Sequence, residues 1–532
     1  MRIRSKAFAI VCFLAVILSA VIVYSGCSKK VTLDAPSDLQ INEKVLTWSK
    51  VENASGYMVD IDGKQTLSGE NSFNLSGLNE LKTYVIKVRA LGDGGKKYES
   101  SKWSDSKEYT PQPETEESLS YAYLDVDGIS GWVVTGIGTV TSDEVVIPPY
   151  RSGEPVIAIY DHAFRYNKKI KRVVFPDTIV QIRDNAFYDC DALKTVELPD
   201  SITAVGESSN NVFSDCDNLE SVKLPGKLTA FSGGWFINTP KLKSLTLPET
   251  LTVLGDNALA GTSIESINIP EGVTEIGDYA FQKTPIETIK IPKNVTKIGA
   301  SAFYESAIKR IEFEEGGKLT ELGDLVFKGC SNLESFVIPP SVTTFGISPF
   351  QGCKNIKSIT IDKNSDLKRL PELPYGSEIT EFTIPNTIEE ISNGAFSGLA
   401  KLKKVVIEDN SELKALPSSC FSNCSSLITV DFGKNSKIKA IKSGAFRNCS
   451  KLTFIDIPKS VTLIENSAFY NCASISSVVI PAGVVNIGAK AFYGWTSDQT
   501  IYIEGRTEAP WSWNVNWYEN SAATVVWGYE QK

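Results

Sequence analysis

The chain has 532 residues, too many for one ordinary globular core, so we expect two or more structural units. Hydrophobic residues make up 42 % and charged residues 22 % of the sequence, which is typical of folded protein and excludes wholesale disorder. The net charge is -9, with acidic and basic residues interspersed. The chain therefore lacks the basic stripe that binds nucleic acid, and we expect no nucleic-acid partner.

Residues 1–27 have the features of an export signal. The basic start "MRIRSK" precedes an apolar run of seventeen residues and then "YSGC". A run this short between basic and small residues indicates an export signal, and the alternative is a retained signal anchor. The ending resembles the bacterial lipoprotein signal: Ser25, Gly26 and Cys27 match it, whereas Tyr24 replaces the usual aliphatic residue. The resemblance implies that Cys27 is lipidated and anchors the mature chain to a membrane outside the cytoplasm.

Residues 31–111 alternate short apolar stretches with turn signals, which predicts an antiparallel β-sandwich. The clearest strand alternates over 84–90. The segment resembles a fibronectin type III domain at Pro36, Trp48, Tyr57, Leu78 and Tyr84. Since a fold does not define a function, the domain is interpreted either as a spacer or as a ligand-binding module. An acidic, Pro-containing linker at 112–119 follows it.

Residues 120–532 repeat one pattern. An anchor phenylalanine recurs, mostly at intervals of 22 to 26 residues, at Phe164, Phe187, Phe213, Phe236, Phe281, Phe303, Phe327, Phe350, Phe396, Phe421, Phe446, Phe469 and Phe492. Leu259 occupies one gap in this series, and a degenerate copy near Leu373 occupies another. A period in the twenties predicts a solenoid, here of about fifteen coils.

Each unit reads L-x-x-V-x-L-P-x-x-V-x-x-I-G-x-x-A-F-x-x-C. In the stretch 193–199, the apolar residues are predicted to point inward, and Thr195 and Glu197 outward. Pro199 is predicted to end the strand because it lacks the N–H that a ladder needs. The glycine, as at Gly277, suggests a turn with positive φ. The phenylalanine then fills the interior of the coil.

This pattern resembles the BspA-like leucine-rich repeats of bacterial surface proteins, over about residues 120–532. The resemblance implies a mainly β chain, with a parallel sheet, short turns or helical segments, and N- and C-terminal caps. It also implies a surface protein that binds host matrix proteins or mediates cell–cell contact. Weak copies replace the strand-ending proline with Asp, Glu or Gly at 314–322, 362–373, 408–416 and 433–441.

Seven cysteines stand three residues after the anchor: Cys190, Cys216, Cys330, Cys353, Cys424, Cys449 and Cys472. Other units hold Asn, Thr or Ser there, so this is a packing slot and we expect buried free thiols. Neighbouring slots would have parallel Cβ vectors, which disfavours the alternative of disulfides. A metal site is the other alternative. We expect neither a metal nor a cofactor.

The exposed strand positions are predicted to form a broad, flat, polar face, which is the natural ligand surface. The residues singled out in this surface are Glu197, Lys223, Asn268, Lys290, Glu312, Asp431 and Asp456. The alternative is that they are only solvated strand surface. The positions form no paired-carboxylate cleft, and the single histidine, His162, occupies a turn position of its repeat. We therefore expect no catalytic residues and no enzyme activity.

A C-terminal tryptophan cluster has two interpretations: a lid on the last coil, or a platform on which sugar rings stack at Trp511, Trp513 and Trp517. Taken together, the sequence predicts a monomeric, membrane-anchored bacterial surface protein. Its solenoid would bind an extracellular protein or polysaccharide in adhesion. The alternative is a glycan-capturing or scaffolding component of a cell-envelope complex.

Overall fold

The computed structural model describes residues 30–42, 44–78, 82–111, 118–126, 128–202, 210–231 and 233–530. The predicted signal with Cys27 lies outside these residues, as does most of the predicted linker. The chain divides into two compact units, residues 1–116 and 117–532. Within the described ranges all regular structure is β, so the coils contain short turns rather than helical segments. No helix in these ranges is long and apolar enough to cross a membrane.

The first unit contains two antiparallel sheets, with strand orders β2-β3-β6 and β5-β4-β7-β9, and a separate parallel pair β1-β8. The strands are β1 (Val31–Thr32), β2 (Gln40–Asn42), β3 (Val45–Thr47), β4 (Gly56–Ile61), β5 (Lys64–Ser68), β6 (Ser72–Asn74), β7 (Tyr84–Leu91), β8 (Tyr98–Glu99) and β9 (Lys107–Tyr109).

The two sheets of this unit share one apolar core. Strand β7 alternates buried and exposed side chains, as its sequence predicts. Trp48 and Tyr57 meet edge to face, with ring centroids 5.1 Å apart, in the geometry that aromatic pairs prefer. The Tyr57 hydroxyl accepts a hydrogen bond from the N–H of Val51 at 2.9 Å, so the buried phenol is satisfied. Leu78 packs against the same core.

The second unit starts with a small sheet of order β10-β11-β14-β13, in which β16 also pairs with β14. Its strands are β10 (Ser120–Val126), β11 (Ile129–Gly136), β13 (Tyr150–Arg151), β14 (Glu154–Ile159) and β16 (Gln181–Ile182). The β10–β11 hairpin is antiparallel, whereas β11, β14 and β16 run parallel. The chain therefore changes here from an antiparallel hairpin to the parallel coils of the solenoid.

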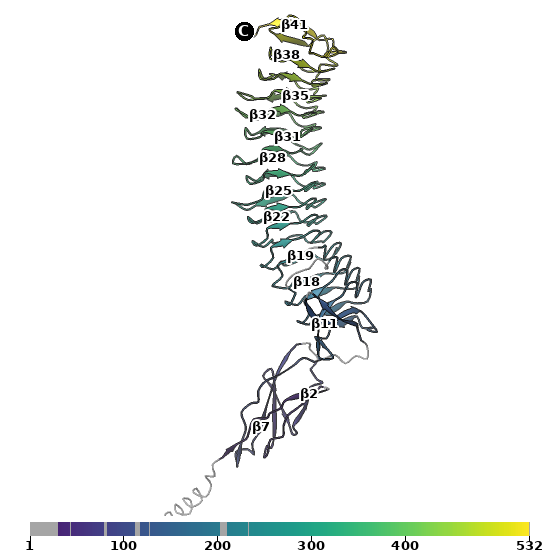
Figure 1. The fold of residues 1–532 in the computed structure, drawn as a ribbon, viewed down its shortest axis with the longest axis vertical. Helices are drawn as coiled ribbons and strands as arrows, with labels where there is room; N and C mark the ends of the chain where they lie inside the picture. The colour runs from purple at the N-terminus through teal and green to yellow at the C-terminus, as the bar shows by residue number, and fades with distance from the viewer. Residues whose placement is uncertain are drawn as a thin grey trace, which may run out of the picture. The chain divides into compact units, whose positions relative to one another are not determined.

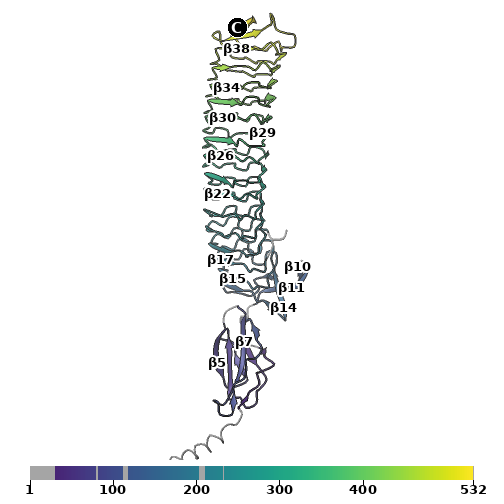
Figure 2. The ribbon, with the colours of Figure 1, turned by 90° about the vertical axis from the view of Figure 1, so that its left-hand side faces the viewer.

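From this sheet onward the unit is a stack of similar coils (Figures 1 and 2). One side of the coils carries the strands predicted from the L-x-x-V-x-L motif. They are β12 (Glu144–Val146), β15 (Arg172–Val174), β17 (Thr195–Glu197), β18 (Ser221–Lys223), β22 (Thr288–Ile291), β24 (Arg310–Phe313), β26 (Ser335–Ile338), β28 (Ser358–Ile361), β30 (Glu381–Ile384), β32 (Lys404–Ile407), β34 (Thr429–Asp431), β36 (Phe454–Ile455), β38 (Ser477–Ile480), β40 (Thr500–Glu504) and β41 (Thr524–Tyr529). We call their solvent-facing side the strand face.

A second series of two-residue strands lies further along the coils, after the position that holds the strand-ending proline in most of them. It comprises β16, β19 (Ala230–Phe231), β20 (Val253–Leu254), β21 (Glu275–Ile276), β23 (Lys297–Ile298), β25 (Glu321–Leu322), β27 (Thr344–Phe345), β29 (Arg369–Leu370), β31 (Glu390–Ile391), β33 (Ala415–Leu416), β35 (Ala440–Ile441), β37 (Leu463–Ile464) and β39 (Asn486–Ile487). Pairing within both series is parallel and joins each coil to its neighbour.

The anchor phenylalanines form ladders through the core. Phe421, Phe446 and Phe469 stack with ring centroids 5.3 Å apart at each step. Leu259 and Leu373 are buried in the two gaps of the series, as predicted. One continuous core runs from Leu119 to Ala523. Since no single coil can bury these side chains alone, the repetition itself supplies the core.

The cysteine slot has a hydrogen-bonding role that the sequence did not reveal. The thiol of each of the seven cysteines donates to the carbonyl oxygen of the preceding coil's anchor, at 3.1 Å from Cys449 to Phe421 and 2.9 Å from Cys330 to Phe303. Together with Cys420, these eight wall cysteines are buried and free, as expected. The thiols satisfy carbonyl groups that face the interior of the wall.

The prediction of positive φ at Gly277 is wrong. Positive φ occurs instead two residues before and two residues after each anchor phenylalanine, as at His162 and Tyr166 around Phe164. Gly277 is required by a close approach, because a Cβ there would lie 2.5 Å from the backbone nitrogen of Asp256 in the preceding coil.

Candidate functional site

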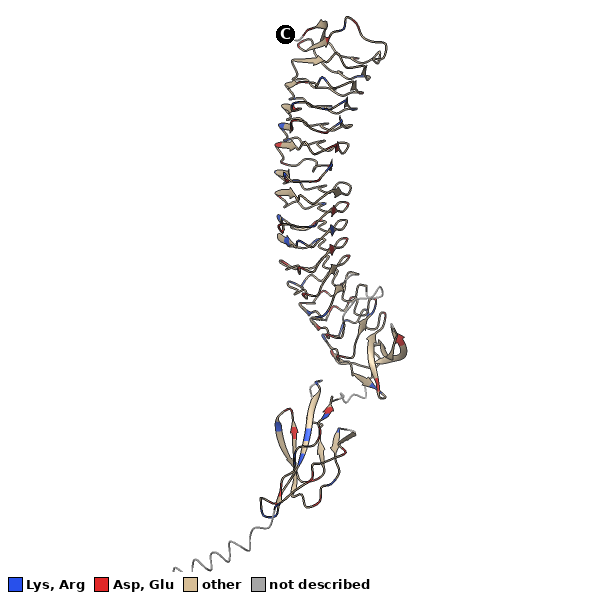
Figure 3. Cartoon of the chain, turned by 60° about the vertical axis from the view of Figure 1, so that its left-hand side comes forward, with Lys and Arg blue, Asp and Glu red and all other residues tan. Residues whose placement is uncertain are grey.

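Lys and Arg residues and Asp and Glu residues are scattered among the coils that form the strand face (Figure 3). Ion pairs join neighbouring coils, for example Lys309 with Glu287 at 2.7 Å and Lys357 with Glu334 at 2.9 Å. Such exposed pairs contribute about 1 kcal/mol or less each. The face therefore presents no broad single-sign surface, and its distinctive features are three local hollows.

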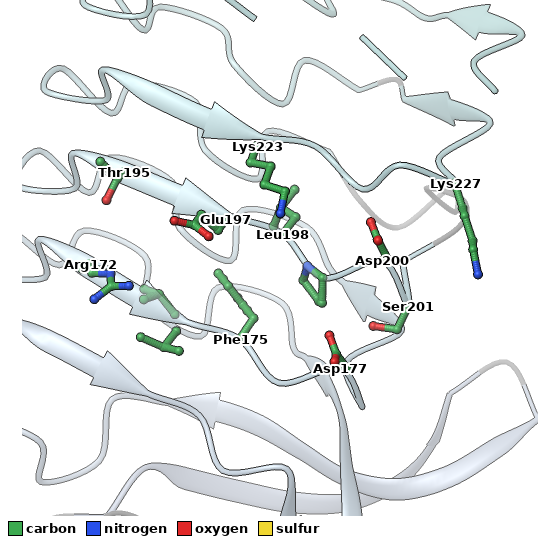
Figure 4. A pocket seen from close by; sticks show the side chains of 13 residues that line it. Arg172, Phe175, Asp177, Thr195, Glu197, Leu198, Asp200, Ser201, Lys223 and Lys227 are labelled. Atoms are coloured by element: carbon green, nitrogen blue, oxygen red, sulfur yellow. The ribbon is translucent and has the colours of Figure 1, made fainter. Parts of the chain in front are cut away.

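The first hollow, of about 490 Å³, contains two of the predicted site residues (Figure 4). Glu197 on β17 and Lys223 on β18 are register partners, so their side chains lie side by side across the two strands. The remaining lining side chains mix further charges of both signs with polar and apolar groups, and include Arg172, Phe175, Asp177, Asp200, Ser201 and Lys227. This mixture suits a polar ligand without net charge.

The second hollow, of about 650 Å³, contains Glu312. Lys290, another of the predicted site residues, is the register partner of Glu312 but pairs instead with Glu314 at 2.7 Å. That hydrogen bond holds the pKa of Glu314 below its ordinary value. Glu312 pairs with Arg310 at 3.3 Å, so these charges already have partners. Asn268 is exposed on the strand face and lines none of the three hollows.

The third hollow, also about 650 Å³, contains Asp431 and Asp456. Strands β34 and β36 pair through Thr429 with Phe454, so Asp431 at the end of β34 and Asp456, directly after β36, lie in neighbouring coils at the same level. The Phe454 side chain projects from the strand face and is 61 % exposed. Asp431 also accepts a hydrogen bond from the N–H of Gly433 at 3.0 Å.

The second and third hollows occur at irregular copies of the repeat. In these coils Glu314 and Gly433 stand where other coils have the strand-ending proline. The backbone turn after the strand differs there, with positive φ at Gly316 and Gly433. The missing prolines are visible in the sequence, but the face was predicted to be flat. The missing prolines could have predicted the hollows, because a different turn after a strand changes the shape of the surface beside that strand.

The C-terminal tryptophans form a lid. Trp513 and Trp517 are each 4 % exposed and meet edge to face at 5.3 Å. Trp495 occupies the cysteine slot of the last copy, and its indole N–H donates to the carbonyl oxygen of Phe469 at 2.9 Å. The prediction of sugar stacking is corrected at Trp513 and Trp517, because neither ring has a free face. Trp511 is 98 % exposed.

The described residues assemble no catalytic constellation. His162 is exposed in a tight turn with φ of 62°, as its repeat position predicted. Burial raises the pKa of the Cys424 thiol to about 12, so this group is not a thiolate nucleophile at neutral pH. Within the described ranges no group of three or more His, Cys, Asp or Glu side chains could hold a metal ion.

Comparisons with known proteins agree with this architecture. A family model described as the BspA type leucine-rich repeat region, of six copies, matches residues 150–263, 252–370 and 373–498. A comparison with curated proteins finds no match.

Among solved structures, a leucine-rich repeat protein from Bacteroides ovatus is similar at 20 % identity and a TM-score of 0.50. That match covers 78 % of this chain and 100 % of the other. A leucine-rich cell surface protein from Faecalibacterium prausnitzii is similar at 22 % identity and a TM-score of 0.36, over 80 % of this chain and 96 % of the other. The pneumococcal vaccine antigen PcpA is similar at 15 % identity and a TM-score of 0.39, over 79 % and 98 %. The repeat pattern, the parallel coils and the family match lead to one conclusion: the chain belongs to the BspA-type leucine-rich repeat family.

Proposed function

We propose that this chain is a membrane-anchored bacterial cell-surface binding protein whose solenoid engages an extracellular protein or glycan in adhesion. The strand face carries the proposal, because it combines a rigid parallel sheet with three hollows that are lined by polar and charged side chains. Exposed polar surface of this kind on a repeat solenoid supports binding rather than catalysis. The family match supports the surface location, since the sequence pattern resembles repeats of bacterial surface proteins.

The proposal includes the two features of the N-terminal region. Cys27 is the lipid attachment site, and the β-sandwich over 31–111 is a fibronectin type III-like spacer between the membrane and the solenoid. Its two antiparallel sheets and shared core support this interpretation. Labelling of cells with a radioactive fatty acid tests the anchor: label is expected in the wild type and lost in Cys27→Ser. Unchanged labelling would contradict it.

The decisive experiment measures binding of the mature chain to arrays of extracellular matrix proteins and polysaccharides. Saturable binding to a member of either class supports the proposal, and binding to neither contradicts it. The strand face is tested by Glu197→Ala and Lys223→Ala, which remove the facing side chains of the first hollow. Thr246→Ala is the matched control, because it truncates an exposed polar side chain at the same repeat position but outside the three hollows.

A second candidate is a glycan-capturing or scaffolding component of a cell-envelope complex. It is favoured by Trp511, whose fully exposed ring lies in the same terminal loop as Val515, which is 90 % exposed. An exposed indole is a suitable surface for stacking on a sugar ring. Loss of glycan binding in Trp511→Ala, with normal binding to matrix proteins, supports this candidate over the first.

A further inference from the structure

We propose that the third hollow is a binding subsite for a neutral glycan, in which a sugar ring packs on Phe454. The inference rests on the proposed function and names one ligand class for the strand face. The volume of the third hollow, about 650 Å³, lies within the range of about 300–1,000 Å³ that is typical of small-ligand pockets.

The hollow is held open by the turn that replaces the proline. Gly433 has φ of 62°, and its N–H donates to the Asp431 carboxylate at 3.0 Å. Asn435 also has positive φ, and its amide donates to the side-chain oxygen of Asn410 in the preceding coil at 2.8 Å. The wall of the hollow is therefore fixed by hydrogen bonds before a ligand arrives, which reduces the entropy cost of binding.

The Phe454 side chain does not belong to the core, so the packing of the coils does not explain its position. The anchor phenylalanines are all buried, whereas Phe454 stands on the strand face, between Thr429 and Ser477 on the neighbouring copies. Its ring lies beside the polar groups of the hollow rather than in the core. An exposed aromatic face flanked by hydrogen-bonding groups matches a sugar ring, which has an apolar C–H face and polar edges.

The charges of the hollow select against a charged ligand. Two carboxylates, Asp431 and Asp456, and two ammonium groups, Lys404 and Lys459, line it together with hydroxyl and amide groups. None of these four forms an ion pair with any residue in the described part of the chain. A neutral polyol can donate to the carboxylates and accept from the lysines. A cationic or anionic ligand would instead meet like charges on half of the set.

The other two hollows lack this combination. In the first hollow the aromatic side chain, Phe175, is half-buried, and in the second the predicted Glu312 is already paired with Arg310. The third hollow is therefore the part of the strand face that combines an exposed ring with carboxylates and ammonium groups outside ion pairs, among the residues that the structure describes.

The test uses the mature chain and immobilised dextran, laminarin and mannan as neutral probes, with heparin and poly-L-lysine as charged probes. We expect saturable binding to at least one neutral probe. That binding should weaken about tenfold or more in Phe454→Ala, because the packing surface is lost. Asp456→Asn should also weaken it. Tyr375→Ala is the control, since it removes an aromatic ring that is 69 % exposed and lies outside the hollow, and circular dichroism verifies the fold of each variant.

Three results would overturn the inference: no binding to any neutral probe, full binding by Phe454→Ala, or binding to poly-L-lysine alone. Binding to poly-L-lysine alone would indicate instead that Asp431 and Asp456 bind a basic protein. Binding of the same wild-type preparation to matrix proteins is measured in parallel. The glycan inference can therefore fail while the proposed adhesion function stands.

Discussion

The substitution Gly277→Ala tests how closely the coils approach one another. The added Cβ would lie 2.5 Å from both the backbone nitrogen and the side-chain oxygen of Asp256, whereas ordinary contact begins at 3.4 Å. Relieving an overlap of this size costs about 1–3 kcal/mol. The Asp256 carboxylate also accepts a 2.7 Å hydrogen bond from the N–H of Asp278, and losing it costs about 0.5–1.5 kcal/mol. A gain of about 0.4–1 kcal/mol from the less flexible unfolded chain leaves a net loss of about 0.5–4 kcal/mol.

Hydrogen exchange measured by mass spectrometry on peptides covering 250–300 reports this loss locally. Each 1.4 kcal/mol of lost stability makes the equilibrium constant for local opening ten times larger. Urea unfolding followed by circular dichroism gives the midpoint for the whole chain. Gly226→Ala is the matched control, because its Cβ would lie 3.6 Å from the Asp200 carboxylate and its φ is not positive. Equal protection and equal midpoints for the two variants would refute the explanation by close approach.

Further predictions concern the wall thiols, the lid and one surface pair. The eight wall cysteines should be unreactive to a thiol reagent in the native mature protein and all reactive after denaturation, and two or fewer reactive groups would contradict free thiols. Trp495→Phe removes the N–H that satisfies the buried carbonyl of Phe469, so hydrogen exchange in the last coils should report a loss of about 1–3 kcal/mol; an unchanged rate would exclude this role. Lys290→Gln should raise the pKa of Glu314 toward its ordinary value, which carboxyl NMR can measure. Since the folded pKa of Glu314 is depressed, its stabilising contribution is present above the ordinary glutamate pKa of 4.5 and is lost as the pH falls through the folded pKa, and an unshifted titration in the variant would contradict this pairing.

Much of the fold followed from the sequence because the repeat is periodic. The inward positions of β17, the anchor ladder and the substitutes Leu259 and Leu373 were all predicted correctly. Alternation and period depend only on residues within one or two copies, so one sequence contains enough examples to define them. The glycine of the repeat was misinterpreted because its constraint comes from the preceding coil.

The candidate site was predicted less completely. The exposed columns were identified, since Glu197, Lys223, Asp431 and Asp456 all lie at alternating strand positions and line hollows. Phe454 was missed because an aromatic residue in a strand is normally a core residue, and its exposure follows from a single alternation step. The buried state of Trp513 and Trp517 was likewise undecided, because both interpretations required the same residues.

The sequence alone is enough to predict a β-rich N-terminal unit followed by a repeat that can bury its apolar side chains only by stacking. It also determined which positions face solvent, because strand alternation is a local property. The folded chain was needed to show which exposed charges pair, which tryptophans close the last coil and where the strand face is hollowed. Those features depend on contacts between residues about one repeat apart, and a missing proline shows its effect only where two adjacent coils meet.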